Sequence, residues 1–166
     1  MHYFSGVTIN SFEPSLSTFK LLKQNISNNS GVNIWNYVLG STNGELSFFE
    51  NSNSNMSSFL KLGEVGWGTE KKSVAKITTV DEFCSKHKIN TIDILKINTQ
   101  GFELEVLKGA KNIFTNNQIK MVYCEVIFSK MYKKLPSFGG LEKFLVERGF
   151  SLVSIYKVQH QNNQTG

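Results

Sequence analysis

The stretch DILKINTQGFELEVLKGA, residues 93–110, decides the fold. It begins within the apolar run IDILKI, whose nearly unbroken pattern is typical of a strand that is buried on both faces. It ends in a helical pattern, with Leu104, Leu107 and Ala110 on one side. The polar residues of KINTQG lie between the two. Because ligands of alternating α/β proteins bind at the carboxyl ends of parallel strands, this order predicts a site directly after the strand.

The rest of the sequence continues the alternation of strand and helix patterns. Strands are expected at residues 6–12, 32–40, 45–50, 73–80, 92–97, 119–128 and 151–158. Helices are expected at residues 15–26, 79–89, 102–114 and 140–150, the second of them entered through a capping box of Thr79 and Glu82. The turn STNG is expected to join its flanking strands as a hairpin-like pair, and residues 51–72 read as a long loop. Together these patterns predict an α/β fold with a mostly parallel sheet and helices on both faces.

Length and composition fit a single domain. The chain has 166 residues, of which 40% are apolar and 12% aromatic, enough to fill a core. We expect the domain to cover residues 1–158 and the polar residues 159–166 to form a loose tail.

Charge and cysteine usage exclude several classes of protein. The net charge of +5 does not indicate a nucleic-acid partner, because the lysines are spread along the chain in runs no longer than two. Cys84 and Cys124 have no CxxC spacing, so neither a zinc site nor a disulfide framework is indicated. No apolar run reaches the roughly 18 residues of a membrane helix, and no signal peptide is evident. We therefore expect a cytoplasmic protein without a membrane partner.

Glu13, in the segment SFEP, is a candidate for ligand binding. A carboxylate at the tip of a strand in a nucleotide-binding α/β unit can accept hydrogen bonds from both ribose hydroxyls. The alternative is a solvated glutamate that favours the following helix through its dipole. No GxGxxG, GxxxxGK[ST] or GxSxG motif occurs, so the sequence does not support a standard NAD site, a P-loop or a hydrolase elbow.

The polar residues after the apolar strand form a second candidate. Lys96 and Asn98 share a face of the strand, and Gln100 lies in the loop beyond. Lys96 could neutralise a substrate or assist an oxyanion, while the two amides could orient hydroxyl groups. The alternative is a strand cap in which Asn98 bonds to its own loop.

Glu125 stands near the end of another apolar strand. Because burial of an unpaired charge is expensive, Glu125 must reach solvent or have a partner such as Lys96. Beside a structural ion pair, acid/base chemistry and metal ligation remain open for this carboxylate.

Several of these segments resemble the FkbM-type methyltransferases. TTVDEFCSKHKINTIDILKINTQGFELEVLKGAKNIF is similar to the central block of that family, in which T(L/V)D precedes IDLLKIDVEGxExxVLxGA. FEPSLSTFKLLKQNI, VLGSTNGELSFFE, CEVIFSKMY and LEKFLVERGFSLV resemble further segments of the family, so that the resemblance covers nearly the whole chain.

The resemblance implies a class I methyltransferase fold, a Rossmann-like three-layer sandwich, with S-adenosylmethionine as cofactor. It implies transfer of a methyl group to a hydroxyl of a saccharide or similar metabolite. Among cofactor contacts, Glu13 matches the ribose-binding acid, Val38 and Leu39 stand where adenine contacts are expected, and Asn98 is a further candidate. The expected catalytic residues are Lys96, Asn98, Gln100 and Glu125. No metal is expected.

Two departures from the family pattern leave an alternative open. The chain is expected to lack the first strand and the glycine loop that holds the methionine part of the cofactor, and to stop before the last strand. Asn98 and Gln100 replace the usual aspartate and glutamate, and an amide cannot serve as a general base. Proton removal would then fall to Glu125 or be left to proximity. The alternative is a fragment that folds like a methyltransferase but binds little or no cofactor.

Overall fold

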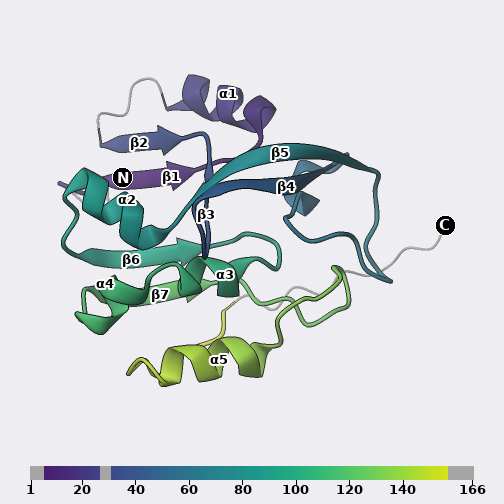
Figure 1. The fold of residues 1–166 in the computed structure, drawn as a ribbon. Coiled ribbons are helices and arrows are strands. Elements are labelled where there is room, and N and C mark those ends of the chain that lie inside the picture. Colours follow the sequence, from purple (N-terminus) through teal and green to yellow (C-terminus); the bar gives the residue numbers. More distant parts are fainter. Residues whose placement is uncertain (1–5, 27–30, 157–166) are drawn as a thin grey trace.

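The computed structural model describes residues 6–26 and 31–156 and shows a mixed α/β fold (Figure 1). The strands are β1 (Ile9–Phe12), β2 (Val32–Trp35), β3 (Val38–Leu39), β4 (Gly44–Asn51), β5 (Glu70–Thr78), β6 (Ile92–Ile97) and β7 (Ile119–Cys124). The helices are α1 (Leu16–Asn25), the short 3-10 helix η1 (Ser54–Met56), α2 (Val80–His87), α3 (Glu103–Lys108), α4 (Lys111–Thr115) and α5 (Phe138–Val146).

Within the described residues the strands form three hydrogen-bonded sheets. Strand β1 pairs in parallel with β2, and β6 pairs in parallel with β7. The third sheet has the order β3-β5-β4, in which β3 runs parallel and β4 antiparallel to β5. The arrowheads of β1, β2 and β6 point to the same side of the molecule (Figure 1). The residues that follow β1 and β6 therefore leave their strands toward the same side.

The expected hairpin around STNG is wrong. Residues 32–40 form two short strands, β2 and β3, instead of one. Strand β5 lies between β3 and β4, so the turn joins strands that are not neighbours. The partner of β4 is β5, which it reaches across the long loop, with Gly44 opposite Ile77. Val38 also pairs with Ile77, from the other side of β5.

The single helix expected after β6 is divided into α3 and α4. The division falls at Gly109, whose carbonyl accepts a hydrogen bond from the Asp81 amide at 3.0 Å instead of from the helix. The carbonyl of Gly40 leaves no room for a Cβ at this position. The carboxylate of Asp81 then accepts hydrogen bonds from the backbone amides of Asn112 and Ile113, at 2.9 and 3.1 Å, and so satisfies the start of α4. Contacts with Asp81, which is distant in the sequence, therefore stabilise both the end of α3 and the start of α4.

One of the two hydrogen bonds of the expected capping box is present at the start of α2. The Thr79 hydroxyl accepts a hydrogen bond from the Glu82 amide at 3.0 Å. The backbone amide of Thr79 is bonded instead to Asn43 Oδ1, at 3.1 Å, which ties the turn after β3 to the start of α2.

Burial of β6 on both faces is also wrong. Leu95 and Ile97 are buried, but Ile94 is 54% exposed, as is Met121 opposite it on β7. One face of this two-stranded sheet is therefore open in the described part of the chain.

The strand expected at residues 151–158 is not formed in its described part. Residues 151–156 have no regular secondary structure, and their side chains are exposed, Val153 by 90%. No sheet edge is paired with this segment, so its apolar alternation has no partner to stabilise a strand. The last two residues of the prediction lie outside the described range.

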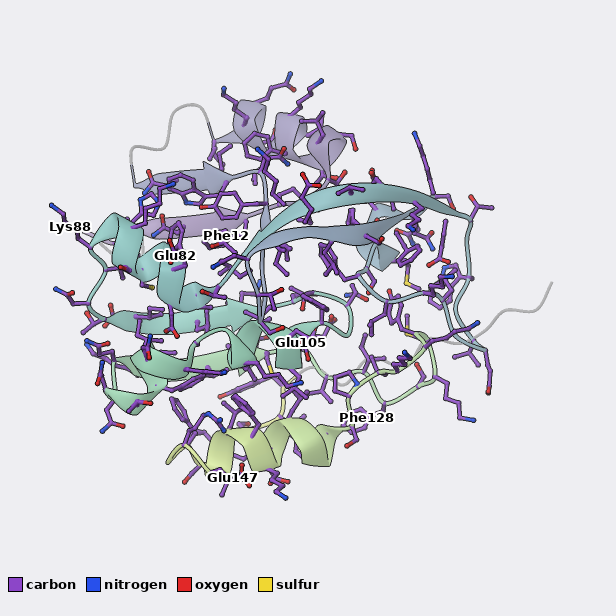
Figure 2. The ribbon with its side chains drawn as sticks, viewed as in Figure 1. Phe12, Glu82, Lys88, Glu105, Phe128 and Glu147 are labelled. Atoms are coloured by element: carbon purple, nitrogen blue, oxygen red, sulfur yellow. The ribbon has the colours of Figure 1, made fainter. Side chains whose placement is uncertain are left out.

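Two hydrophobic clusters hold the fold together. In the larger one, aromatic rings link distant elements: Phe12 of β1, labelled in Figure 2, and Phe83 of α2 have ring centroids 4.9 Å apart. Leu107 of α3 is completely buried there. The smaller cluster joins Met56 to Met131 and Tyr132, and so fastens the long loop to the segment after β7.

In the residues that the structure describes, no helix is long and apolar enough to cross a membrane.

Candidate functional site

The chain turns sharply where β6 ends, and the turn is built around one buried carboxylate. Gln100 and Gly101 both have positive φ angles, of 53° and 97°. Glu103, only 2% exposed, accepts with a single oxygen, Oε1, from the Thr99 amide at 2.9 Å, the Thr99 hydroxyl at 3.2 Å and the Gly101 amide at 3.2 Å. Three donors on one oxygen offset its burial. Glu103 therefore stabilises the turn through its hydrogen bonds to Thr99 and Gly101.

The turn presents the side chain of Gln100 to three polar partners. Its Nε2 donates to Glu125 Oε2 at 2.7 Å and to Asn98 Oδ1 at 3.1 Å. Its Oε1 lies 3.1 Å from the hydroxyl of Tyr132. We call Asn98, Gln100, Glu125 and Tyr132 the amide–carboxylate cluster. It joins the carboxyl ends of β6 and β7 to the segment after β7.

Glu125 occupies the first position after β7, and its amide donates to the carbonyl of Ile97 at 3.0 Å. Burial raises the pKa of its carboxyl, the nearby charge of Glu103 raises it further, and Lys96 lowers it. The charged form is thus less favoured than in water, and the group takes up a proton more readily than an exposed glutamate.

The partner of Glu125 is Gln100 rather than Lys96. Within residues 6–26 and 31–156, Lys96 makes no ion pair, and its exposed side chain acts on Glu125 only through its charge.

Tyr132, 32 residues from Gln100 along the chain, was not among the predicted site residues. Its hydroxyl also lies 3.0 Å from the carbonyl of Met56, so one proton is shared between two acceptors. Burial raises the pKa of this phenol, which keeps it neutral and able to donate. Its only signal in the sequence is an aromatic residue in CEVIFSKMY, which did not reveal its contact with the turn after β6.

Glu13 directly follows β1 and turns back onto the start of α1. Its Oε1 accepts from the amide of Ser15 at 2.8 Å, and Ser15 in turn donates its hydroxyl to Glu50 at 3.2 Å. Burial raises the pKa of Glu13, the bond from Ser15 lowers it, and the charge of Glu50 raises it. Its second oxygen, Oε2, has no hydrogen-bond donor among the described residues. Glu13 thus supports the start of α1, as in the alternative interpretation of the sequence, and its Oε2 atom can still accept a hydrogen bond.

Val38 and Leu39 belong to the larger hydrophobic cluster, where they are 3% and 7% exposed. Both pair with β5. Since their side chains are enclosed by core residues, any contact with an adenine ring would have to come from the backbone at this point.

The structure thus brings together three of the predicted site residues, Asn98, Gln100 and Glu125, and adds Tyr132 to them. No hydrogen bond or ion pair in the described part of the chain links Glu13 to this cluster, although β1 and β6 lead to the same side of the molecule. In the same ranges, no group of three or more His, Cys, Asp or Glu side chains could hold a metal ion.

Comparison with known proteins supplies one match. Residues 2–152 match the family model described as methyltransferase FkbM domain. The searches of curated proteins and of solved structures returned no match.

Proposed function

The chain belongs to the methyltransferase FkbM domain family, and from this premise we propose that it transfers a methyl group from S-adenosylmethionine to a hydroxyl group of a saccharide or similar metabolite. The proposal includes a Rossmann-like class I arrangement of the strands. In support of that arrangement, the pairs β1–β2 and β6–β7 are parallel, and their strands lead to one side of the molecule.

The amide–carboxylate cluster is the observation that carries the proposal. It lies at the carboxyl ends of two parallel strands, where ligands of α/β proteins bind. A glutamine amide donates to its carboxylate, so one oxygen of Glu125 is fixed in place. The other oxygen, Oε1, has no donor among the described residues and can accept a proton from a bound hydroxyl.

Three residues of the cluster and the neighbouring Lys96 would have different roles in activating the hydroxyl. Asn98 and Gln100 can orient a hydroxyl by hydrogen bonds but cannot remove its proton. Glu125 can, because burial raises the pKa of its carboxyl and so makes it a better proton acceptor. Lys96, close enough to influence Glu125 by its charge, can stabilise negative charge that develops on the oxygen.

When bound, S-adenosylmethionine supplies an already activated methyl group, so the protein's main task is to hold the hydroxyl in line with it.

The described residues fit one part of the cofactor. The free oxygen of Glu13, half-buried at the end of β1, is suited to a ribose hydroxyl. The buried side chains of Val38 and Leu39 fit adenine less well, because they are closed off by the core. A ribose contact through Glu13 is therefore the cofactor contact that we propose.

A second candidate is a chain that folds in this way but binds little or no cofactor. It is favoured by the amides at positions 98 and 100, which stand where the family pattern has acids. It is also favoured by the bond that Gln100 already makes with Glu125, which uses part of the cluster internally.

Isothermal titration of the 166-residue chain with S-adenosylmethionine and S-adenosylhomocysteine separates the two candidates. Saturable heat with both compounds supports the methyltransferase. Absence of heat, together with no protection against thermal unfolding, would favour the second candidate.

Transfer of radioactive methyl from S-adenosylmethionine to a panel of saccharides then tests catalysis. Glu125→Gln is expected to lower the rate roughly 100-fold or more without changing cofactor affinity, the usual contribution of a general base. Glu142→Gln, an exposed change of the same kind on α5, is the matched control. An unchanged rate in Glu125→Gln would remove this residue from the mechanism.

A further inference from the structure

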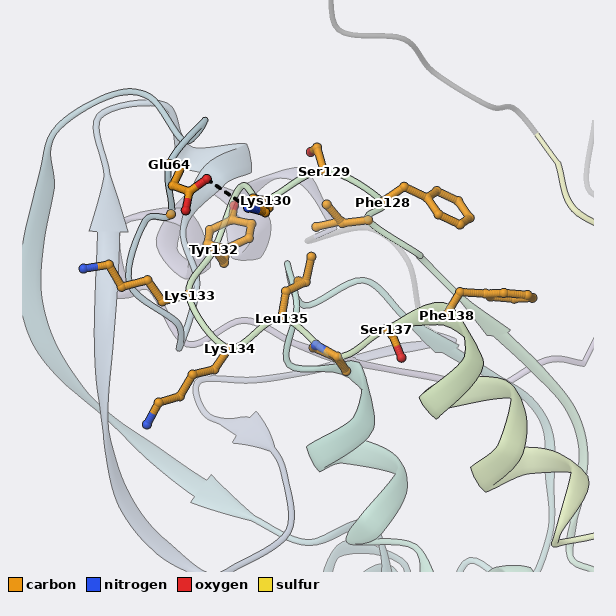
Figure 3. A pocket seen from close by; sticks show the side chains of 13 residues that line it. Glu64, Phe128, Ser129, Lys130, Tyr132, Lys133, Lys134, Leu135, Ser137 and Phe138 are labelled. Carbon is orange, nitrogen blue, oxygen red and sulfur yellow. Dashed lines mark hydrogen bonds and ion pairs between the residues drawn. The ribbon is translucent and has the colours of Figure 1, made fainter.

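A hollow of about 570 Å³ lies beside the amide–carboxylate cluster, between the segment after β7 and the loop at Gly63 (Figure 3). We call it the loop hollow. It is lined by Gly63, Glu64, Ile127, Phe128, Ser129, Lys130, Tyr132, Lys133, Lys134, Leu135, Pro136, Ser137 and Phe138. Tyr132 belongs both to its wall and to the cluster, where its hydroxyl reaches Gln100. Of the cluster, Tyr132 alone lines the hollow, so a ligand there would be separated from Gln100 by this one side chain.

The charged residues in the wall of the loop hollow are three lysines and one glutamate, so its charge is positive. Lys130 pairs with Glu64 at 3.2 Å, the contact drawn as a dashed line in Figure 3. Lys133 and Lys134 extend outward from the rim and make no ion pair in the described part of the chain. Their long, flexible stems allow the ammonium groups to turn toward a bound anion.

The other side of the hollow carries two aromatic rings. Phe128 is 72% exposed, and its ring lies 6.1 Å from that of Phe138, centroid to centroid. In Figure 3 the two rings stand side by side at the end away from Lys133 and Lys134. A large apolar ring left in water gains by covering an apolar surface, such as the C–H face of a sugar ring.

Helix α5 begins at the same place, with its capping residue Ser137 and its first residue Phe138 in the wall. Its first turn has no acidic residue, so the positive end of the helix dipole adds to the charge of the lysines.

We propose that the acceptor is an anionic sugar, one that carries a phosphate or carboxylate group, and that the loop hollow binds it. The lysines hold the anionic group, Phe128 and Phe138 cover the ring, and the hydroxyl to be methylated lies toward Tyr132 and Glu125. This inference rests on the proposed function, because it assigns a substrate class to that same site.

NMR titration of the ¹⁵N-labelled 166-residue chain tests the inference through binding alone. The probes are glucose 6-phosphate, glucuronate and, as the neutral reference, methyl glucoside. We expect amide signals of residues 128–140 to shift saturably with the anionic probes and to respond much more weakly to methyl glucoside. The tighter of the two anionic probes identifies phosphate or carboxylate as the natural group.

Charge variants test whether binding of the anionic probes depends on the lysines of the loop hollow. The double variant Lys133→Gln/Lys134→Gln is expected to weaken binding of the anionic probes roughly tenfold. Glu64→Gln, which frees Lys130, is expected to strengthen it about twofold. Lys86→Gln, an exposed change of equal charge on α2, is the control and should leave the affinity unchanged.

Three results would overturn the inference: no shift with either anionic probe, equal binding of methyl glucoside, or equal affinity in the chain with and without Lys133 and Lys134. A parallel titration with S-adenosylhomocysteine keeps the two proposals apart. Lysine-dependent sugar binding without S-adenosylhomocysteine binding would contradict methyl transfer and support the anion site. The reverse result would overturn the anion site alone.

Discussion

Replacing Gln100 by glutamate would reverse the main contact of the amide–carboxylate cluster. The Nε2 atom that now donates to Glu125 Oε2 at 2.7 Å would become a second carboxylate oxygen. Two carboxylates this close cannot both stay ionised. The pair must keep one proton, or one of the two side chains must turn away toward solvent.

The cost can be worked from the geometry. Two unit charges about 4 Å apart repel each other by about 4 kcal/mol at an effective dielectric constant of about 20. Because Glu125 is only half-buried, solvent screening and rotation relieve part of this repulsion. We expect Gln100→Glu to lower the free energy of unfolding by about 1–3 kcal/mol at pH 8.

The loss should depend on pH with a definite sign. The shared proton gives the pair a folded-state pKa above the unfolded value of a glutamate, about 4.3. Stability of the variant is therefore nearest to wild type below about pH 4.3 and is lost as the pH rises through the raised pKa.

Urea unfolding followed by tryptophan fluorescence at pH 4.5, 6 and 8 measures the effect. The double variant Gln100→Glu/Glu125→Gln is the matched control, because it restores one carboxylate and one amide with their places exchanged. We expect it to recover most of the stability at pH 8. Equal stability of wild type and Gln100→Glu at all three pH values would refute the contact between residues 100 and 125.

Three further predictions concern other parts of the structure. Tyr132→Phe removes a donor from the buried carbonyl of Met56 and from the partly buried Gln100 Oε1, and should cost about 1–3 kcal/mol of unfolding free energy, measured by urea titration. A neutral effect would contradict the hydroxyl contacts. Glu13→Ala should weaken S-adenosylhomocysteine binding by about 1–3 kcal/mol in isothermal titration, through a lost hydrogen bond to a charged group, and an unchanged affinity would exclude the ribose contact. Gly109→Ala should destabilise the protein by about 1–3 kcal/mol, because the new methyl group meets the carbonyl of Gly40. The control Gly139→Ala, whose methyl group meets nothing within 4 Å, should change stability by less than about 1 kcal/mol. Similar melting temperatures for the two variants would contradict the packing at α3.

Local patterns were sufficient for much of the fold. The periodicity of residues 16–26 and 80–87 predicts two helices, and both are present, although α2 buries side chains in the core and α1 buries none. The polar residues after IDILKI indicated the turn at Gln100, because a run of polar groups after an apolar strand has to find partners or solvent. Asn98 and Glu125 were named as candidates near two strand ends, but their common contact with Gln100 was not predicted, since Lys96 was the expected partner of Glu125.

What could not be predicted depends on contacts between distant parts of the chain. The choice of β5 as the partner of β4 is decided by a pairing that spans the whole long loop. The requirement for glycine at the end of α3 comes from the carbonyl of Gly40, 69 positions away along the chain. Tyr132 looked like an ordinary aromatic residue, since its role depends on where the loop after β7 returns to the turn after β6. None of these contacts leaves a signal in the local sequence.

The environment of Glu103 and Gly109 has a consequence for how this family diverges. Glu103 holds a turn with three hydrogen bonds, and Gly109 makes room for a neighbouring backbone, so folding constrains both positions. A descendant that abandoned catalysis would keep them as long as it stayed folded. Position 98, whose side chain is exposed, would then be freer to change than position 100, whose contacts with Glu125 and Tyr132 also serve the fold.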